Sequence, residues 1–348
     1  MLDAKEIITK LHREHTASGA ELLELLRSED IDTMEALRQA AQETAQKTFG
    51  KAVYLRGLIE FSNFCKNDCL YCGIRRSNKN ASRYRLTPEE ILECCATGYE
   101  LGLRTFVLQG GEDAFFTDEK ICNILKSIKS TYPDCAITLS LGEKSKESYD
   151  LLKKSGADRY LLREETANPL HYQKLHPKNM KLENRIECLR TLKNLGFQTG
   201  AGFMVGSPFQ TLEDIATDLF FIQELKPQMV GIGPFIPHSQ TEFANFPQGD
   251  LDLTLFILSL LRIMNPKVLL PATTALSSIN PEGRILGILS GANVVMPNVS
   301  PMEQRKNYAL YNNKASVNEE SAEGLNLLQK QLDKINCKID FSRGDYQE

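Results

Sequence analysis

The stretch FSNFCKNDCLYCGIRRSNKN, residues 61–80, places Cys65, Cys69 and Cys72 on one short segment, with Gly73 directly after the last of them. The spacing is C-x3-C-x2-C, and the segment follows the apolar run Tyr54–Phe61, which we expect to form a strand. Cysteine thiolates are the usual ligands of iron–sulfur clusters, and three of them can bind three irons of a 4Fe-4S cube and leave the fourth open. We therefore predict a 4Fe-4S cluster on the loop after the first strand.

A zinc site and a redox pair are the alternatives for this loop. Structural zinc normally takes four ligands, and no further histidine or cysteine lies close enough in the sequence to complete the set. A C-x2-C redox pair would have no use for Cys65. The other six cysteines fit small buried hydrophobes in reduced form, namely Cys94, Cys95, Cys122, Cys135, Cys188 and Cys337.

Outward from this loop, apolar runs alternate with amphipathic segments along most of the chain. Residues 87–90 and 211–214 have the Thr caps and acidic first turns that begin helices. Eight strands in such an alternation predict a (β/α)8 TIM barrel, an α/β fold whose active site lies on the loops after the strands. We expect these strands at 54–61, 105–109, 136–141, 159–163, 199–205, 229–235, 268–272 and 293–296. The expected division is an N-terminal helical extension (1–50), the barrel (51–314) and a C-terminal helical tail (315–348).

Composition narrows the class of protein. The 348 residues are 42% hydrophobic and 25% charged, which is ordinary for a globular domain. The formal net charge of −4 argues against a nucleic-acid binder, which would carry a basic excess. The run Leu255–Leu261 is far shorter than the roughly 20 residues that span a bilayer. The charged N-terminus lacks the apolar core of a signal peptide, so we expect a cytoplasmic protein without membrane contact.

With the aromatic Tyr71 before the last cysteine, the triad resembles that of the radical S-adenosylmethionine (SAM) superfamily. That resemblance implies that SAM chelates the open iron and is cleaved by an electron from the cluster to methionine and a 5′-deoxyadenosyl radical. Gly110, Gly111 and Glu112 look like the Gly-Gly-Glu element that binds the SAM amino group; a simple turn is the alternative. No auxiliary cluster is expected.

Further SAM contacts follow from the same resemblance. Glu165 is suited to the ribose hydroxyls, and Arg185 is the candidate for the SAM carboxylate, although sequence alone favours an ordinary surface arginine. The strand around Met204 would offer a backbone edge to adenine, unless it is merely tightly packed. The full set of expected SAM contacts is Tyr71, Gly110, Gly111, Glu112, Ser140, Glu165, Arg185 and Met204.

Within the superfamily, the chain resembles most closely the HydE family of FeFe-hydrogenase maturases, through stretches such as RYRLTPEE, RYLLREETANP, MVGIGPFIPH, LPATTAL and GANVVMPN. This implies a radical reaction on the cysteine-bound Fe(CO)2CN unit made by the maturase HydG, on the path to a di-iron species used by the scaffold protein HydF, with an external electron donor. Expected substrate residues are Thr138, Arg163, Thr273, Thr274, Tyr308 and Tyr311. For Thr273 and Thr274, the alternative is that they are ordinary β-branched strand residues. For Tyr308 and Tyr311, the alternative is that they are packing residues spaced i,i+3 on a helix.

Three other functions stay open. Methylornithine synthase shares the cysteine spacing, the RYRLT segment and a stretch like ETANPLHYQKL. Biotin synthase needs a second cluster with cysteine ligands, but residues 199–202 read TGAG where one is expected. A non-enzymatic iron–sulfur scaffold would leave Glu112, Glu165 and Arg185 without a purpose.

Two departures from the family pattern stand out. Many relatives carry histidine where this chain has Glu164, which leaves the role of this position open. Some relatives hold a second cluster on three cysteines near the C-terminus, where this chain has only Cys337.

Overall fold

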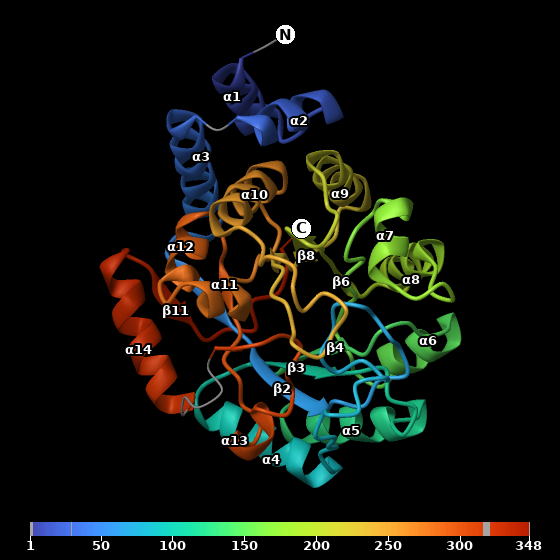
Figure 1. Cartoon of the computed structure of the whole chain (residues 1–348). Helices are drawn as coiled ribbons and strands as arrows, with labels where there is room; N and C mark the ends of the chain where they lie inside the picture. Colours follow the sequence, from blue (N-terminus) through green and yellow to red (C-terminus); the bar gives the residue numbers. More distant parts are fainter. Residues whose placement is uncertain (1–2, 29, 316–320, 348) are drawn as a thin grey trace.

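The computed structural model describes residues 3–28, 30–315 and 321–347. Three helices precede the first strand: α1 (Ala4–Glu14), α2 (Gly19–Arg27) and α3 (Ile31–Phe49). Each begins after a residue whose side chain accepts a backbone N–H of the first turn, the usual N-cap arrangement. Helix α2 packs on α9 (Leu212–Leu225) and α3 on α10 (Leu251–Met264), so this extension covers one side of the barrel (Figure 1).

A parallel sheet of six strands forms most of the barrel wall. Its order is β2 (Gly57–Ser62), β3 (Thr105–Gly110), β4 (Ala136–Ser140), β5 (Arg159–Leu161), β6 (Gln198–Ala201) and β8 (Met229–Val230). The crossover helices lie outside the strands (Figure 1), and apolar side chains fill the layer between. These helices are α4 (Pro88–Glu100), α5 (Asp118–Thr131), α6 (Lys146–Lys154), α8 (Leu182–Asn194), α9 and α10.

The wall closes through shorter pairings. Strand β1 (Ala52–Leu55) pairs with β10 (Val294–Val295), and single bridges join Met229 to Leu269, Pro271 to Val294 and Leu58 to Asn298. Seven of the eight expected strands contain a named strand, but residues 268–272 contribute only these bridges. The predicted barrel is confirmed, with an irregular seventh position.

Three expected strands are each divided. The first splits into β1 and β2, the fifth into β6 and β7 (Met204–Val205), and the sixth into β8 and β9 (Gly233–Pro234), which pairs with β7. Gly202 lies at the break between β6 and β7 and has a φ of 152°. A Cβ at this position would stand 2.0 Å from the carbonyl oxygen of Gly231. The backbones therefore approach too closely at this point for any side chain.

The remaining elements are α7 (Pro169–Leu175), α11 (Thr274–Ile279), α12 (Gly283–Leu289), α13 (Met302–Arg305), α14 (Ser321–Lys334) and β11 (Lys338–Asp340). The expected helical tail contains α14, but its last part forms the strand β11, which pairs in parallel with β1. The free edge of β1 supplies backbone partners that a sequence pattern does not reveal.

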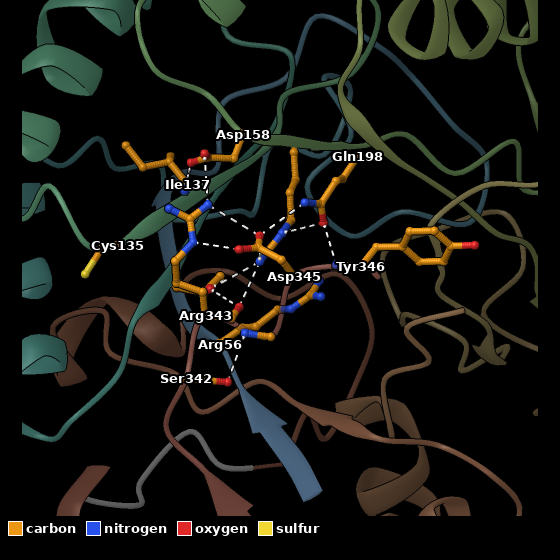
Figure 2. Close-up of polar contacts among 12 residues, drawn as sticks. Arg56, Cys135, Ile137, Asp158, Gln198, Ser342, Arg343, Asp345 and Tyr346 are labelled. Carbon is orange, nitrogen blue, oxygen red and sulfur yellow. Dashed lines mark hydrogen bonds and ion pairs between the residues drawn. The ribbon is translucent and has the colours of Figure 1, made fainter. Parts of the chain in front are cut away.

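Beyond β11, the tail closes the barrel at the amino-terminal ends of its strands (Figure 2). Arg159 is fully buried and donates to Asp345 Oδ1 (2.7 Å) and to the carbonyl of Arg343 (2.8 Å). Arg343 in turn donates to Asp158 (3.1 Å) and Asp345 (2.7 Å). We call Asp158, Arg159, Arg343 and Asp345 the floor network. Within the described ranges, no helix has the length and apolar character needed to cross a membrane.

Candidate active site

The cysteine loop runs from β2 to α4 and is fixed by backbone hydrogen bonds to distant segments. Leu70 N–H donates to the carbonyl of Leu175 (3.0 Å), and Gly73 N–H to that of Leu310 (2.9 Å). Lys66 N–H donates to the carbonyl of Glu112 (2.9 Å). The three predicted ligands, Cys65, Cys69 and Cys72, are half-buried on this loop.

Glycines allow the close approaches that hold the loop. A Cβ at Gly111 would lie 2.2 Å from the carbonyl oxygen of Phe64, the residue before the first cysteine. A Cβ at Gly73 would lie 2.2 Å from the carbonyl oxygen of Ala309. Backbone therefore packs on backbone on both sides of the cysteine loop.

The three thiols are neutral when no metal is bound. Burial raises the pKa of Cys65, Cys69 and Cys72, that of Cys72 to about 12, and Cys65 raises the pKa of Cys69 and Cys72 in addition. Bound iron supplies the positive charge that such thiolates lack. Each cysteine ligand of a 4Fe-4S cube binds a different iron, so the three sulfurs need not surround one point. In the described part of the chain, no three His, Cys, Asp or Glu side chains surround a position for a single metal ion.

Glu112 lies beside the loop at the end of β3. Its carboxylate pairs with Lys66 (2.9 Å) and accepts the N–H of Glu143 (3.1 Å). Gly142, with φ 74°, leaves the room that Glu112 occupies, because a Cβ there would lie 2.1 Å from Oε1. Gly110, the last residue of β3, lies against the ring of Phe61. Sequence analysis missed Lys66 and Glu143, although Lys66 directly follows a ligand cysteine.

Tyr71 is held by a histidine that the sequence analysis did not single out. His176 Nδ1 lies 3.0 Å from the carbonyl of Tyr172, so this nitrogen carries the proton and Nε2 accepts. The Tyr71 hydroxyl then donates to Nε2 (3.2 Å). Burial lowers the pKa of His176 to about 3, which keeps the ring neutral. Met204, on β7, belongs to a small apolar cluster against which Tyr71 packs.

Glu165 follows β5 in a left-handed conformation, with φ 68°. Its carboxylate lies 3.0 Å from Arg163. The pair is poorly oriented: Glu165 Oε2 and Arg163 Nε and Nη2 are buried and have no hydrogen-bond partner among the described residues. Buried polar atoms are normally hydrogen-bonded, so this ion pair is a candidate for completion by a ligand.

Arg185, on α8, is buried, and the interpretation as an ordinary surface arginine is wrong. Its Nε donates to Glu143 (2.7 Å) and its Nη1 to the carbonyl of Arg163 (3.1 Å). Glu143 also donates its N–H to Glu112, so Arg185 and Glu112 meet through one residue. The two SAM candidates that sequence placed 73 positions apart thus lie in one polar group.

Thr138 and Ser140 lie on β4, alternating with Ile137 and Leu139 of the apolar layer, so both face the barrel interior. The Thr138 hydroxyl is buried without a partner in the described structure, and so is that of Thr273, which precedes α11. Thr274 begins α11 and lines a small cavity with Asn298 and Lys314. The threonine pair therefore does not form a strand.

Tyr308 and Tyr311 lie in an irregular loop after α13, and the expected helix there is wrong. The Tyr308 hydroxyl is 3.4 Å from Gln109 Nε2, at the end of β3. Burial raises the pKa of Tyr311 to about 12. Close by, Lys314 forms a buried ion pair with Glu60 of β2, a contact across 254 residues that no sequence signal indicated.

These residues fit the 4Fe-4S cluster and the SAM molecule that the sequence implies. Three half-buried thiols stand on an anchored loop, and orphaned polar atoms of Thr138, Arg163, Glu165 and Thr273 stand on neighbouring strands and loops of the barrel. Such atoms are costly to bury unless a ligand completes them.

Comparison with known proteins identifies the family of the chain. Residues 59–222 match the family model described as Radical SAM superfamily. The chain is 46% identical to the FeFe-hydrogenase maturase subunit HydE of Thermotoga maritima over 97% of its length and 96% of the relative's. It is 30% identical to 3-methylornithine synthase of Methanosarcina barkeri, covering 84% and 82%.

Solved structures give the same fold. The crystal structure of methylornithine synthase (PylB) superposes with a TM-score of 0.83 at 26% identity, covering 96% of this chain and 97% of that one. The maturase HydG superposes with a TM-score of 0.82 at 20% identity, covering 97% and 76%. The loop, the barrel and these likenesses agree: the chain is a radical SAM enzyme that uses a 4Fe-4S cluster and SAM, and it belongs to the HydE family of FeFe-hydrogenase maturases.

Proposed function

We propose that this chain catalyses the radical step of FeFe-hydrogenase maturation in which the cysteine-bound Fe(CO)2CN unit made by HydG is converted toward a di-iron species used by HydF. The observation that carries the proposal is the set of orphaned polar atoms inside the barrel, on Thr138, Arg163 and Thr273. A small polar substrate with carboxylate and ammonium ends is the kind of ligand that would complete them.

The SAM site is assigned to the residues around the cysteine loop. Glu112 would accept the SAM ammonium, and Arg185 would bind the carboxylate through the guanidinium nitrogen that neither Glu143 nor Arg163 uses. Glu165 Oε2 would accept from the ribose hydroxyls. The cluster, when bound, supplies the electron that splits SAM. The remaining assigned contacts lie around these three: Tyr71, Gly110, Gly111, Ser140 and Met204.

Lys66 must release Glu112 for this assignment to hold. The Lys66 side chain is 61% exposed, whereas that of Glu112 is 9% exposed, so the lysine can move into water while the carboxylate stays. The SAM ammonium carries the same charge as the lysine and can take its place at the carboxylate. Lys66 would then act as a placeholder for the ammonium group.

The substrate is assigned to the barrel interior beneath SAM. Arg163 would clamp the carboxylate of the cysteine unit bidentately, with the Thr138 and Thr273 hydroxyls as further donors. Thr274, Tyr308 and Tyr311 are assigned to the far wall. Tyr308 is 2% exposed and keeps a neutral phenol, because burial raises its pKa well above the usual range. A dry wall of this kind protects a radical from water.

Partners and location follow from the same proposal. The chain would receive its substrate from HydG, pass its product toward HydF and take electrons from an external donor. Nine unpaired cysteines are typical of a reducing compartment, so a cytoplasmic location is proposed. Residues 1–50, 51–314 and 315–348 are proposed as extension, barrel and tail.

Lysine mutase activity is the second candidate, because the methylornithine synthase relative is 30% identical and PylB has the same fold. An in vitro maturation assay tests the first candidate: HydG, HydF, apo-hydrogenase, SAM and reductant are combined with and without this chain. We expect hydrogenase activity only when the chain is present, and none with Cys69→Ala. Equal activity without the chain, or formation of methylornithine from L-lysine, would contradict the proposal.

A further inference from the structure

Two carboxylic acids are fully buried beside the SAM site, and the proposed function uses neither. Glu164 follows β5, and Asp218 lies on α9; both side chains are 0% exposed. Each has one carboxyl oxygen without a hydrogen-bond partner in the described structure, Oε1 of Glu164 and Oδ2 of Asp218. A buried ionised carboxylate is normally paired with a cation or fully hydrogen-bonded.

The other two carboxyl oxygens hold the backbone on both sides of Glu165. Glu164 Oε2 accepts the N–H of Gly202 (2.8 Å), at the break between β6 and β7. Asp218 Oδ1 accepts the N–H of Ala167 in a short hydrogen bond. Between these anchors, Glu165 N–H donates to the carbonyl of Gly202 (3.0 Å), and Met204 N–H donates to that of Glu165 (3.3 Å).

Glu165 needs such anchors because its backbone is strained. A non-glycine residue at φ 68° persists where surrounding contacts fix it. The segment carries the proposed acceptor for the SAM ribose, and Met204 belongs to the proposed adenine edge. Both therefore depend on contacts that Glu164 and Asp218 make from behind.

No cation in the described surroundings forms an ion pair with Glu164 or Asp218. Arg163 is the cation that acts on Glu164, but it faces Glu165 at 3.0 Å. Asp214, on the same helix as Asp218, adds negative charge, and His171 on α7 stays neutral because burial lowers its pKa. Burial raises the pKa of Glu164 to about 8 and that of Asp218 well above its usual range.

We propose that Glu164 and Asp218 form a buried acid pair that retains a proton at neutral pH and acts as a positioning device for the SAM site. The inference rests on the proposed assignment of Glu165 and Met204 to SAM. Neither acid would touch SAM. Ionisation of Glu164 would place a negative charge in the apolar layer with no cation paired to it, and the backbone around Glu165 would shift to let water reach it.

SAM affinity as a function of pH tests the pair. The dissociation constant is measured on the cluster-reconstituted protein between pH 7 and 9 for the wild type and for Glu164→Gln, which keeps an acceptor for Gly202 but cannot ionise. Taking the ratio of the two constants cancels the titration of SAM itself. The dissociation constant of the wild type divided by that of Glu164→Gln should rise by about tenfold between pH 7 and 9, as Glu164 ionises. Glu164→Ala should bind SAM weakly at every pH.

A readout without SAM separates this inference from the proposed function. In the reconstituted, SAM-free protein at pH 7, infrared spectroscopy should show the C=O stretch of buried protonated carboxyls, and Glu164→Gln should reduce its intensity. Glu213→Gln, an exposed carboxyl on the same helix, should leave the band unchanged. If the carboxyl band is present but the protein does not bind SAM, the assignment of Glu165 and Met204 to SAM is wrong and the acid pair still holds. No such band, or a flat ratio of constants, would overturn the pair.

Discussion

The two ends of the barrel treat buried polar groups in opposite ways. In the floor network, fully buried Arg159 has donors matched to Asp345, to the carbonyl of Arg343 and to the hydroxyl of Thr105. Toward the catalytic side, Arg163, Glu165 and Thr273 leave buried atoms without hydrogen-bond partners in the described structure, and so does Thr138 in the middle of β4. Not every polar atom near the floor is satisfied, since Arg56 Nε and Nη2 and the Nδ2 atoms of Asn265 and Asn293 also lack hydrogen-bond partners in the described structure.

This difference distinguishes structure from function. A satisfied buried network stabilises the fold and gains nothing from a ligand, whereas unsatisfied atoms cost stability until a ligand arrives. We therefore assign the tail residues Arg343 and Asp345 to folding and propose a binding role for Arg163, Glu165 and Thr273. Substitutions at the two ends should fail in different assays.

The largest effect is expected at the cysteine loop. Cys69→Ala removes one of three cluster ligands, so reductive SAM cleavage should fall to background, because the electron for it comes from the cluster. The thiol is half-buried on a loop held by backbone hydrogen bonds, so the fold should remain. The measurements are 5′-deoxyadenosine by chromatography and bound iron per chain, with circular dichroism for the fold.

Cys337→Ala is the control for that variant, since Cys337 is also half-buried but directly precedes β11, at the amino-terminal side of the barrel. It should retain iron and SAM cleavage. Retained 5′-deoxyadenosine production in Cys69→Ala would refute the cluster assignment.

The next effect concerns the floor. Asp345→Ala leaves Arg159 buried with one partner fewer, and should lower the free energy of unfolding by about 2 kcal/mol, less than for a fully buried pair because Asp345 is partly exposed. SAM cleavage per cluster should not change. Denaturant unfolding measures the loss, and Asp333→Ala, an exposed tail carboxyl bonded only to Gln329, is the control.

The same pair gives a pH dependence with a definite sign. Burial opposes ionisation of Asp345, but hydrogen bonds from Arg343 and Arg159 lower its pKa below the usual range. Its contribution to stability is therefore present above the unfolded pKa of about 4 and is lost as pH falls below it. The stability difference between wild type and Asp345→Ala should shrink between pH 5 and pH 3; a constant difference would contradict the ion pair.

Arg163→Ala tests the catalytic side. Product formation from the iron–cysteine substrate should fall by about tenfold or more, because truncation removes a charged hydrogen-bonding group, while SAM cleavage without substrate should fall less. The two rates are measured in parallel by chromatography. Arg163→Lys keeps the charge without the planar fork and should restore only part of the loss. Equal losses in both rates would place Arg163 on SAM.

The smallest effects form a matched pair of buried threonines on adjacent strands. The Thr105 hydroxyl donates to the carbonyl of Arg343 (2.8 Å) and accepts from Arg159 (3.1 Å), whereas that of Thr138 has no partner in the described structure. Thr105→Val should cost about 1–2 kcal/mol, and Thr138→Val about zero or a slight gain. Equal costs would erase the distinction between the two ends.

Local patterns in the sequence predicted what depends on local structure. The cysteine loop, Gly110–Glu112 and seven of the eight strands follow from spacing and alternation over a few residues. The divided strands at Gly202 and the irregular 268–272 segment depend on how neighbouring backbones meet, which a single strand's pattern does not contain.

Long-range pairings could not be predicted. Lys314 reaches Glu60 across 254 residues, and β11 pairs with β1 from the far end of the chain. Arg185 resembled a surface residue because a helix pattern does not show that Glu143 and the Arg163 carbonyl lie against it. The acid pair needed Asp218, a residue that looks like any polar position of an amphipathic helix.

The most direct test of the central claim is substrate-dependent SAM cleavage under anaerobic conditions. The reconstituted protein receives SAM and reductant with the HydG-derived iron–cysteine species, with L-lysine or with neither, and 5′-deoxyadenosine and products are quantified. We predict turnover of the iron–cysteine species and none of lysine. Turnover of lysine alone, or SAM that stays intact in all three reactions despite a reducible cluster, would contradict the account.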